Sequence, residues 1–501
     1  MKAQPDNDRV STGVEGLDAI LGGGLPRNRI YLLEGRTGTG KTTLALQFLL
    51  DGVRHGERGL YITLSETKEE LIAVAKSHGW SLDDIVIYDL AVPEKDVVPD
   101  SQYTLYHPSE VELGETTKAI FKQFDLVKPA RVVLDSMSEI RLQAREALRY
   151  RRQILALKQF FVGKQSTIVL VDDQTAESSP GLLESVVHGV IVLQQLVHGY
   201  GPTRRNLYVL KLREVKYRSG FHDINIETGG IFVYPRLADA EHRTPPNVKP
   251  LLSGVPELDM LIGGGLDAGT ATLVMGPAGS GKSTLAAQFA SSACAQGRTV
   301  AFFIFDEQPA TLIARTRAIG INLEGLVKTR KVIIRQVDPG ECSAGEFSYL
   351  VRQTVERDNA SLVVIDSVNA YFESMPEEKF LTAHVHELLS YLSHQGVSTF
   401  LVLAQSGIVG TMTTPVDLSY LADTVLLLRF FESAGDVRQA LSVVKKRTGD
   451  HERSIREFRI TSHGIQVGKP LREFQGVLTG VPQYVGKATP LLQDDDDRAK
   501  K

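Results

Sequence analysis

The chain has only two cysteines in 501 residues, Cys294 and Cys342. Two thiols cannot build a disulfide framework, and their spacing matches no metal-binding motif, so we expect both to be reduced and buried. Long apolar runs are absent too, and none approaches the roughly 20 residues of a membrane-spanning helix. The amino terminus has no apolar signal core. We therefore expect a cytoplasmic protein without a membrane partner.

An excess of basic residues is a further absence. The formal net charge is −4, whereas a protein whose main task is to hold nucleic acid is usually strongly basic. The charge argues against nucleic acid as the main partner, although it leaves room for a local basic groove. Hydrophobic residues make up 42% of the chain and charged residues 23%, which are the proportions of an ordinary globular protein.

The most informative segment runs from Gly35 to Thr42 and reads GRTGTGKT. It fits the phosphate-binding loop pattern of Gly, four residues, Gly-Lys and Ser or Thr. The apolar run Ile30 to Leu33 before it predicts a strand, and the periodic run Leu44 to Leu50 after it predicts a helix. Glycines let backbone N–H groups surround phosphate oxygens, and the helix adds its positive dipole end. We expect Lys41 to reach the β- and γ-phosphates and the Thr42 hydroxyl to bind Mg²⁺.

The same motif recurs as GPAGSGKS from Gly276 to Ser283. The segment that starts at Thr12 aligns without a gap with the segment that starts at Ser253, far beyond the loops, which indicates an internal duplication. We predict an α/β chain of two tandem P-loop NTPase domains, each a mostly parallel sheet with helices on both faces. The predicted parts are a loose segment 1–10, a first domain 11–233, a linker 234–249, a second domain 250–475 and a tail 476–501.

Acidic residues follow predicted strands in both halves. One strand ends at Glu66, and its counterpart ends at Asp306-Glu307. A carboxylate in that position would overhang the γ-phosphate and orient or deprotonate an attacking hydroxyl, so these three acids are the catalytic candidates. Two further apolar strands end at Asp135 and Asp366. A buried strand that delivers an aspartate to the Mg²⁺ shell is the usual second nucleotide motif.

The resulting site predictions can be set out together. The ATP-binding residues are Gly35, Thr37, Gly38, Thr39, Gly40, Lys41, Thr42 and Thr43 in the first half and Gly276, Gly279, Ser280, Gly281, Lys282, Ser283 and Thr284 in the second. The Mg²⁺ ligands are Thr42 and Asp135 in the first half and Ser283 and Asp366 in the second.

A Lys-x-Arg sequence occurs late in each half, as Lys211 and Arg213 and as Lys445 and Arg447. Each pair follows an apolar strand, on which residues i and i+2 point to one face. Two cations on one face, far along the chain from the phosphate loop, are what a nucleotide site completed by a neighbouring subunit needs. We therefore predict that these pairs contact ATP in trans; a solvated strand end is the alternative.

These motifs, GRTGTGKT and GPAGSGKS with VVLDS, VVIDS, KLR and KKR, resemble those of the circadian-clock protein KaiC family. The resemblance covers about residues 10–485 and is most specific in DLSYLADTVLLLRFFE and IREFRITSHGIQV. It implies two RecA-like domains and a homohexamer of two stacked rings, with ATP and Mg²⁺ at each subunit interface. The first domain would mainly hydrolyse ATP, and the second would be an autokinase. A small clock-type regulatory protein is a possible further partner.

By the same resemblance, the phospho-acceptors fall on Ser419-Tyr420, with Thr414 at a nearby third hydroxyl position. The chain departs from the family pattern in three places. Tyr420 stands where the family usually has Thr, and the family's paired glutamates become Ser65-Glu66 and Asp306-Glu307. The tail after Phe474 is short and different.

Two other functions compete with this interpretation. A RecA-like recombinase or replicative helicase would use the same fold as a nucleic-acid motor, and an ATP-gated scaffold would lack phosphotransfer. The negative charge, the two complete ATPase motifs and the resemblance at Ser419-Tyr420 favour the self-phosphorylating ring.

Overall fold

The computed structural model describes residues 8–90, 108–174, 181–197, 201–237, 249–338, 340–373, 380–407, 412–414, 416–433, 435–478 and 483–486. The chain divides into two compact units, Met1–Arg236 and Leu237–Lys501. Most of the predicted linker, residues 238–248, lies outside the described residues. Each unit is described by itself below.

The first domain is built on a sheet in which nine described strands lie in the order β11-β10-β9-β8-β3-β7-β6-β4-β5. The six strands from β8 to β5 run parallel, and β9, β10 and β11 extend the sheet antiparallel beyond β8. The strands are β3 (Ile30–Gly35), β4 (Gly59–Thr63), β5 (Ile85–Asp89), β6 (Arg131–Asp135), β7 (Thr167–Asp173), β8 (Gly189–Leu196), β9 (Arg204–Leu212), β10 (His222–Glu227) and β11 (Gly230–Tyr234), with β1 (Arg9–Val10) and β2 (Leu25–Pro26) paired separately.

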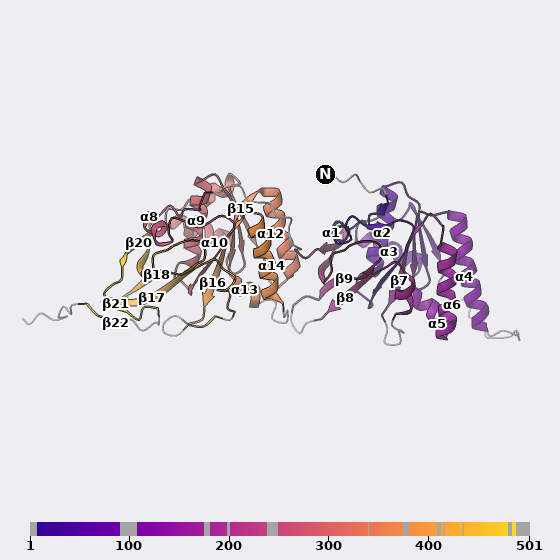
Figure 1. Ribbon diagram of the computed structural model, residues 1–501. Coiled ribbons are helices and arrows are strands. Elements are labelled where there is room, and N and C mark those ends of the chain that lie inside the picture. The colour runs from indigo at the N-terminus through magenta and orange to yellow at the C-terminus, as the bar shows by residue number, and fades with distance from the viewer. Residues whose placement is uncertain are drawn as a thin grey trace, which may run out of the picture. The chain divides into compact units, whose positions relative to one another are not determined.

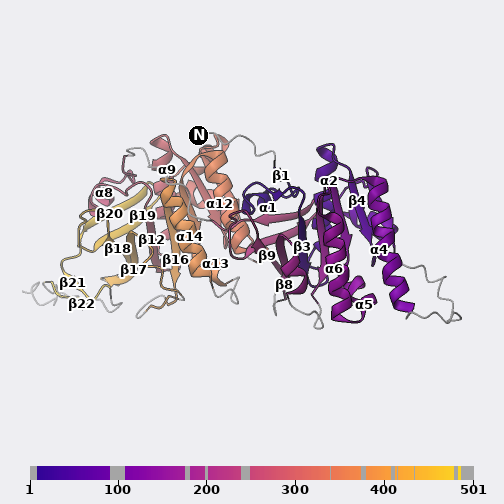
Figure 2. The same ribbon diagram turned by 45° about the vertical axis from the view of Figure 1, so that its right-hand side comes forward.

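Helices cover both faces of this sheet because its strands alternate buried side chains between two cores. Leu33, Tyr61 and Val133 pack with α1, α2 and α3, whereas Leu32 and Leu134 pack with the remaining helices. In Figures 1 and 2, α4, α5 and α6 stand together on one side of the sheet. The helices are α1 (Glu15–Ile20), α2 (Lys41–Arg54), α3 (Lys68–Ser77), α4 (Pro108–Val127), α5 (Met137–Ala144), α6 (Ala147–Phe161) and α7 (Leu182–Val186).

The second domain repeats this topology with its own nine-stranded sheet, ordered β14-β13-β15-β16-β12-β17-β18-β19-β20 among the described residues. Its strands are β12 (Ala271–Pro277), β13 (Thr299–Ile304), β14 (Val332–Gln336), β15 (Ala360–Asp366), β16 (Ser398–Gln405), β17 (Thr424–Ser433), β18 (Asp436–Lys446), β19 (Arg456–Thr461) and β20 (Gly464–Pro470), with β21 (Phe474–Gln475) and β22 (Gln483–Tyr484) paired separately. Its helices are α8 (Pro256–Leu261), α9 (Lys282–Ala295), α10 (Pro309–Ala318), α11 (Leu323–Lys328), α12 (Ala344–Asp358), α13 (Val368–Glu373) and α14 (Leu381–His394).

The predicted fold class, two tandem α/β domains with mostly parallel sheets, is confirmed. Three details at the domain ends differ from the sequence expectation. Val10 is buried in the first core, so packing begins before residue 11. Tyr234 is the last residue of β11. Val477 is buried against Phe431 beyond residue 475, because the turn after β21 folds back onto the second domain. Both cysteines are buried, and no disulfide joins them.

Candidate functional site

The two phosphate loops lie between a central parallel strand and the helix that follows it. Gly40 and Gly281 cap α2 and α9 with φ angles of 100° and 98°, and neither helix has a side-chain cap. A Cβ on either glycine would also lie 2.7 Å from the Cδ1 atom of Ile226 or Ile460, so a larger residue would have to displace that side chain. The first-turn N–H groups therefore stay available for an anion, as a nucleotide phosphate requires.

The lysines of the two loops are each 8% exposed. Lys41 Nζ donates to Arg36 O at 2.9 Å and forms an ion pair with Asp173 Oδ1 at 2.7 Å. Lys282 Nζ donates to Pro277 O at 2.7 Å, and burial lowers its pKa to about 8. The register of β7 and β16 puts Ala404 where the first domain has Asp173. Only the first loop therefore has a carboxylate at this strand end.

The predicted Mg²⁺ ligands pair up in both domains. Asp135 is 6% exposed, accepts from the Tyr61 hydroxyl at 2.5 Å and is hydrogen-bonded to Thr42. Asp366 is hydrogen-bonded to Ser283 in the same way, and burial raises the pKa of both aspartates. A buried carboxylate beside a hydroxyl is the donor set that Mg²⁺ takes in nucleotide sites, so both domains fit the ion. Among the other predicted ATP-binding residues of the loops, Thr39, Thr43, Ser280 and Thr284 are buried, and Thr37 is exposed.

The candidate catalytic acids have different partners in the two domains. Glu66 is half-buried, and its Oε2 is a buried atom without a hydrogen-bond partner among the described residues. Burial, and then the charge of Asp135, raise the pKa of Glu66. Glu307 instead accepts from Arg315 at 2.8 Å, and exposed Asp306 accepts from Ser367 Oγ at 2.7 Å. The strand-end pattern in the sequence indicates the acids, but no sequence pattern indicates Arg315 beside Glu307.

The Lys-x-Arg pairs bind main-chain carbonyls of their own domain. Lys445 Nζ donates to the carbonyls of Ser419 and Ala422, both at 2.8 Å, and Arg447 donates to Tyr420 O at 2.6 Å. In the first domain, Lys211 donates to Glu184 O, and Arg213 donates to Ser185 O at 3.2 Å. The pair in the second domain therefore holds the segment that carries the predicted acceptors.

These pairs and the phosphate loops lie at opposite ends of the sheet. Asp423 exchanges hydrogen bonds with Ala271 at the start of β12, at 2.8 and 3.0 Å, and Arg447 N–H donates to Asp423 O at 2.9 Å. The phosphate loop follows the other end of β12, five residues beyond Ala271 at Gly276. At about 3.3 Å a residue, this separates Asp423 from the loop by roughly 16 Å.

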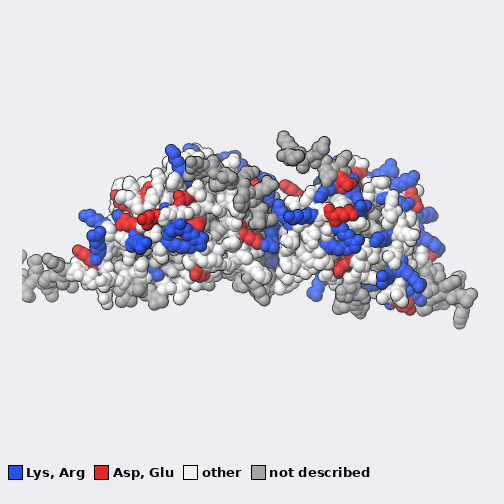
Figure 3. All heavy atoms as spheres, in the orientation of Figure 1, with Lys and Arg blue, Asp and Glu red and all other residues white. Residues whose placement is uncertain are grey.

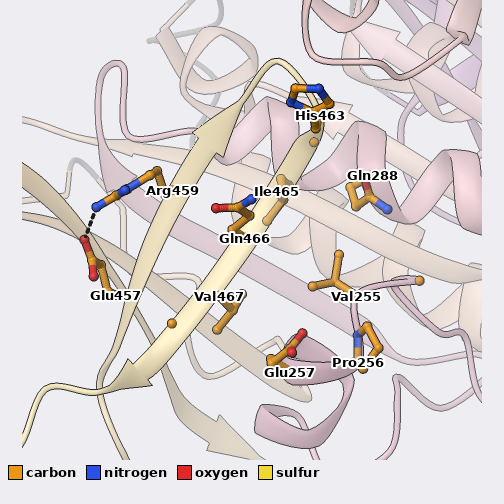
Figure 4. Close-up of a pocket in the computed structure, with 13 residues that line it drawn as sticks. Val255, Pro256, Glu257, Gln288, Glu457, Arg459, His463, Ile465, Gln466 and Val467 are labelled. Atoms are coloured by element: carbon orange, nitrogen blue, oxygen red, sulfur yellow. Dashed lines mark hydrogen bonds and ion pairs between the residues drawn. The ribbon is translucent and has the colours of Figure 1, made fainter.

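Two of the cavities in the second domain bear on this site. One of about 300 Å³ lies at the phosphate loop and is lined by Lys282, Ser283, Thr284, Arg315 and Ile460 among others, so it has the position and size of a nucleotide pocket. The other, of about 610 Å³, lies between β20 and α8. Figure 4 shows Glu257 and Pro256 on one side of it and Ile465, Gln466 and Val467 of β20 on the other.

In the first domain, the elements that match the walls of this second cavity pack closely together. Gln47 accepts from Ile231 N–H at 2.8 Å, and Gly16 lies so close to β11 that a Cβ on it would be 2.0 Å from Val233 O. In the second domain Glu257 replaces that glycine, and Gln288 donates to Ser253 O at 2.8 Å instead. The cavity thus goes with one substitution between the repeats, Glu257 for Gly16, and with a different hydrogen bond of the glutamine that both repeats share.

The surface bears on the nucleic-acid alternative. On the face in Figure 3, basic and acidic side chains intermingle over the described parts of both domains.

None of the helices in the described ranges is both long and apolar enough to cross a membrane.

Fold and site together define the class. Two mostly parallel α/β domains, each with a phosphate loop at the carboxyl end of a central strand and an Asp-hydroxyl pair beside it, make this chain a tandem P-loop ATPase. The family model "ATPase: KaiC" matches residues 10–238 and 251–472. The chain belongs to the KaiC ATPase family, which confirms the resemblance noted in the sequence.

Curated relatives agree with this assignment. The chain is 28% identical to the circadian clock oscillator protein KaiC of Parasynechococcus marenigrum (strain WH8102), over 95% of this chain and 93% of that protein. It is 29% identical to the KaiC of Thermostichus vulcanus and 27% identical to that of Synechococcus elongatus (strain ATCC 33912 / PCC 7942 / FACHB-805), in each case over 95% of this chain and 92% of the relative.

Proposed function

We propose that this chain is a self-phosphorylating ATPase that works as a hexameric double ring in timing or signalling. Its first domain hydrolyses ATP, and its second domain transfers phosphate to Ser419 of a neighbouring chain. One observation carries the proposal: the predicted acceptors and the phosphate loop lie at opposite ends of β12 and β17. Since roughly 16 Å separates these ends, transfer within one chain has no route. A head-to-tail interface joins the two ends and closes into a ring when its rotation allows.

The proposed step moves one phosphoryl group. The Ser419 hydroxyl oxygen attacks the γ-phosphorus, the bond from that phosphorus to the bridging oxygen breaks, and ADP leaves. The hydroxyl proton passes to Glu307, or to Asp306 beside it. ATP bound with Mg²⁺ supplies the phosphoryl group, and Ser283 and Asp366 would hold the ion. Lys282 neutralises phosphate charge, while Lys445 and Arg447 position the acceptor segment and approach the neighbouring site.

Local contacts favour Ser419 over Tyr420 as the main acceptor. Ser419 is half-buried, and its N–H donates to Asp417 Oδ1 at 2.9 Å. Hydrogen bonds from the Ser419 hydroxyl and N–H hold the pKa of Asp417 below its ordinary value. The Tyr420 side chain is 55% exposed, and the carbonyls of Ser419 and Tyr420 accept from Lys445 and Arg447. The serine is held in place, whereas the phenol projects freely, so we rank Tyr420 second.

The loop lysines test the division of labour between the domains. Lys282→Ala should abolish phosphate incorporation while ATP binding at the first domain persists, because the transition-state charge in the second domain loses its cation. Lys41→Ala should abolish ATP binding at the first domain, while phosphate incorporation at the second domain persists. The readout is intact mass after incubation with Mg-ATP. Normal incorporation in Lys282→Ala would rule out the two-site assignment, and no incorporation in the unaltered chain would leave an ATP-gated scaffold.

Mixed rings test transfer between chains. A chain with Ser419→Ala and Tyr420→Phe keeps the kinase site but lacks both acceptors, and a Lys282→Ala chain keeps the acceptors but lacks the kinase site. In verified mixed rings, phosphate should appear only on the Lys282→Ala chain. Label on the other chain, or none at all, contradicts transfer to Ser419 or Tyr420 in trans.

Assembly and nucleic acid provide two further tests. ATP at a subunit interface adds binding free energy only to the ring, so sedimentation should show hexamers with Mg-ATP and smaller species without it. A monomer at micromolar protein under saturating Mg-ATP contradicts the ring. Strong stimulation of the ATPase rate by single-stranded DNA would instead favour a nucleic-acid motor.

A further inference from the structure

Arg315 lies between the catalytic acid and the nucleotide cavity of the second domain. Its guanidinium donates to Glu307 Oε2 at 2.8 Å, and its side chain is one wall of the 300 Å³ cavity that Lys282 and Ile460 also line. Its Nε is buried and has no hydrogen-bond acceptor among the described residues. One cation therefore has access to two anions, the acid that holds it now and a nucleotide in the cavity.

The first domain provides an internal comparison, because the repeats align without a gap from Glu66 and Glu307 onward. Val74 occupies the position of Arg315 and packs against the first core. The two charge arrangements are opposite. In the first domain the loop lysine has an acidic partner, and the catalytic acid has a buried oxygen without a hydrogen-bond partner among the described residues. In the second domain the catalytic acid is the group with a partner, and Ala404 stands at the strand end beside the loop lysine.

We propose that Arg315 is a phosphate-binding residue of the second domain, which exchanges Glu307 for the phosphates of bound ATP. A triphosphate brings several negative charges into the cavity, and a planar guanidinium fork matches phosphate oxygens well. The exchange frees Glu307 only when ATP is present. The phosphate contact concerns nucleotide binding alone, whereas the value of freeing Glu307 rests on the proposed phosphotransfer.

A purely structural role for Arg315 predicts different behaviour. The ion pair joins Glu307, just before the N-cap of α10, to Arg315 in the second turn of that helix, and the side chains of Arg315 and Glu307 are 38% and 26% exposed. An ion pair that is partly exposed in this way contributes about 1 kcal/mol or less to stability. Its loss would lower the melting temperature slightly and leave nucleotide affinity unchanged.

Nucleotide affinity is measured in the full chain with Lys41→Ala, so that the second domain dominates binding. The probe is a fluorescent ATP analogue with Mg²⁺. Arg315→Val, which copies the first domain, should weaken binding about tenfold, within the range of one charge-assisted hydrogen bond. Arg315→Lys should recover part of that loss. Arg317→Ala is the matched control, because Arg317 is an exposed cation two residues away that pairs with Glu324.

Glu307→Ala tests the exchange itself. If ATP must draw Arg315 away from Glu307, removing the acid should tighten binding when Arg315 is present and have no such effect beside Arg315→Val. Unchanged affinity in Arg315→Val, or the same effect of Glu307→Ala in both backgrounds, overturns the proposal. Arg315→Met, which keeps an apolar stem, repeats the test if the valine variant is unstable. The assay needs no phosphotransfer, so failure of the proposed autokinase and failure of this proposal are separate outcomes.

Discussion

Arg131→Leu should destabilise the first domain selectively. Arg131 is 2% exposed at the start of β6, and its Nε lies 2.5 Å from Glu57 Oε2. Its NH1 lies 3.2 Å from Asp51 Oδ2 and donates to the carbonyls of Ser11 and Phe48 at 2.9 and 2.6 Å. A leucine fills part of the space, as Leu362 does at the matching position of β15, but it removes the guanidinium beside two acids and two carbonyls.

The expected cost follows from what remains behind. Removing one partner of a buried ion pair costs about 3–5 kcal/mol. In a domain of this size 1 kcal/mol shifts the melting temperature by about 2–4 °C, so the first domain should melt roughly 6–20 °C earlier. The lower half of the range is expected, because Glu57 keeps its other partner, Arg27, at 2.6 Å.

Differential scanning calorimetry of the full chain measures this shift. The second domain already has Leu362 at the matching position, so its transition is the internal control and should not move. Adding Glu57→Gln and Asp51→Ser to Arg131→Leu should recover much of the loss, since the stranded charges are then gone. A first transition within about 2 °C of the unaltered chain, less than 1 kcal/mol would produce, would refute the reasoning.

The same network predicts a pH dependence. Burial by itself raises the pKa of Glu57, but hydrogen bonds and charges from Arg27 and Arg131 outweigh it and leave the pKa below the ordinary 4.5. A carboxyl with a lowered folded-state pKa stabilises the fold above pH 4.5, and that contribution is lost as the pH falls through the folded-state value. Arg131→Leu removes one of the two cations, so its stability should fall less steeply below pH 4.5 than that of the unaltered chain.

Three other variants test the first domain. Asp173→Ala should tighten ATP binding there several-fold, measured in a Lys282→Ala background, because Lys41 no longer has to leave an acidic partner; weaker binding would contradict this. Glu66→Gln should lower phosphate release by the first domain about 10²–10⁴-fold with ATP binding retained, and an unchanged rate would exclude Glu66 as the base. Gly16→Ala should lower the first melting transition, since overpacking costs about 1–3 kcal/mol and the new Cβ meets Val233 O; a higher transition would show that α1 moves away freely.

Local patterns in the sequence determined the two domains and the cradle of each site. The loop from Gly35 to Thr42 and its copy could be recognised because glycines, lysine and hydroxyl act within one turn of chain. The strands that end at Asp135 and Asp366 could be found because a strand buried on both faces is a continuous apolar run. Because the chain is duplicated, each of these patterns occurs twice, and each copy supports the interpretation of the other.

Only the tertiary structure decided which charges meet. The pairing of Lys41 with Asp173 depends on β7 lying beside β3, although the two residues are far apart in the sequence. The hydrogen bond from Lys445 to Ser419 O depends on β18 running antiparallel to β17. The sequence did not predict this antiparallel extension, which each sheet has. Arg315 meets Glu307 because two helical turns bring them together, yet a lone arginine on a helix carries no signal until its cavity is known. Sheet order and cavity walls are set by packing across the whole domain, so no local pattern records them.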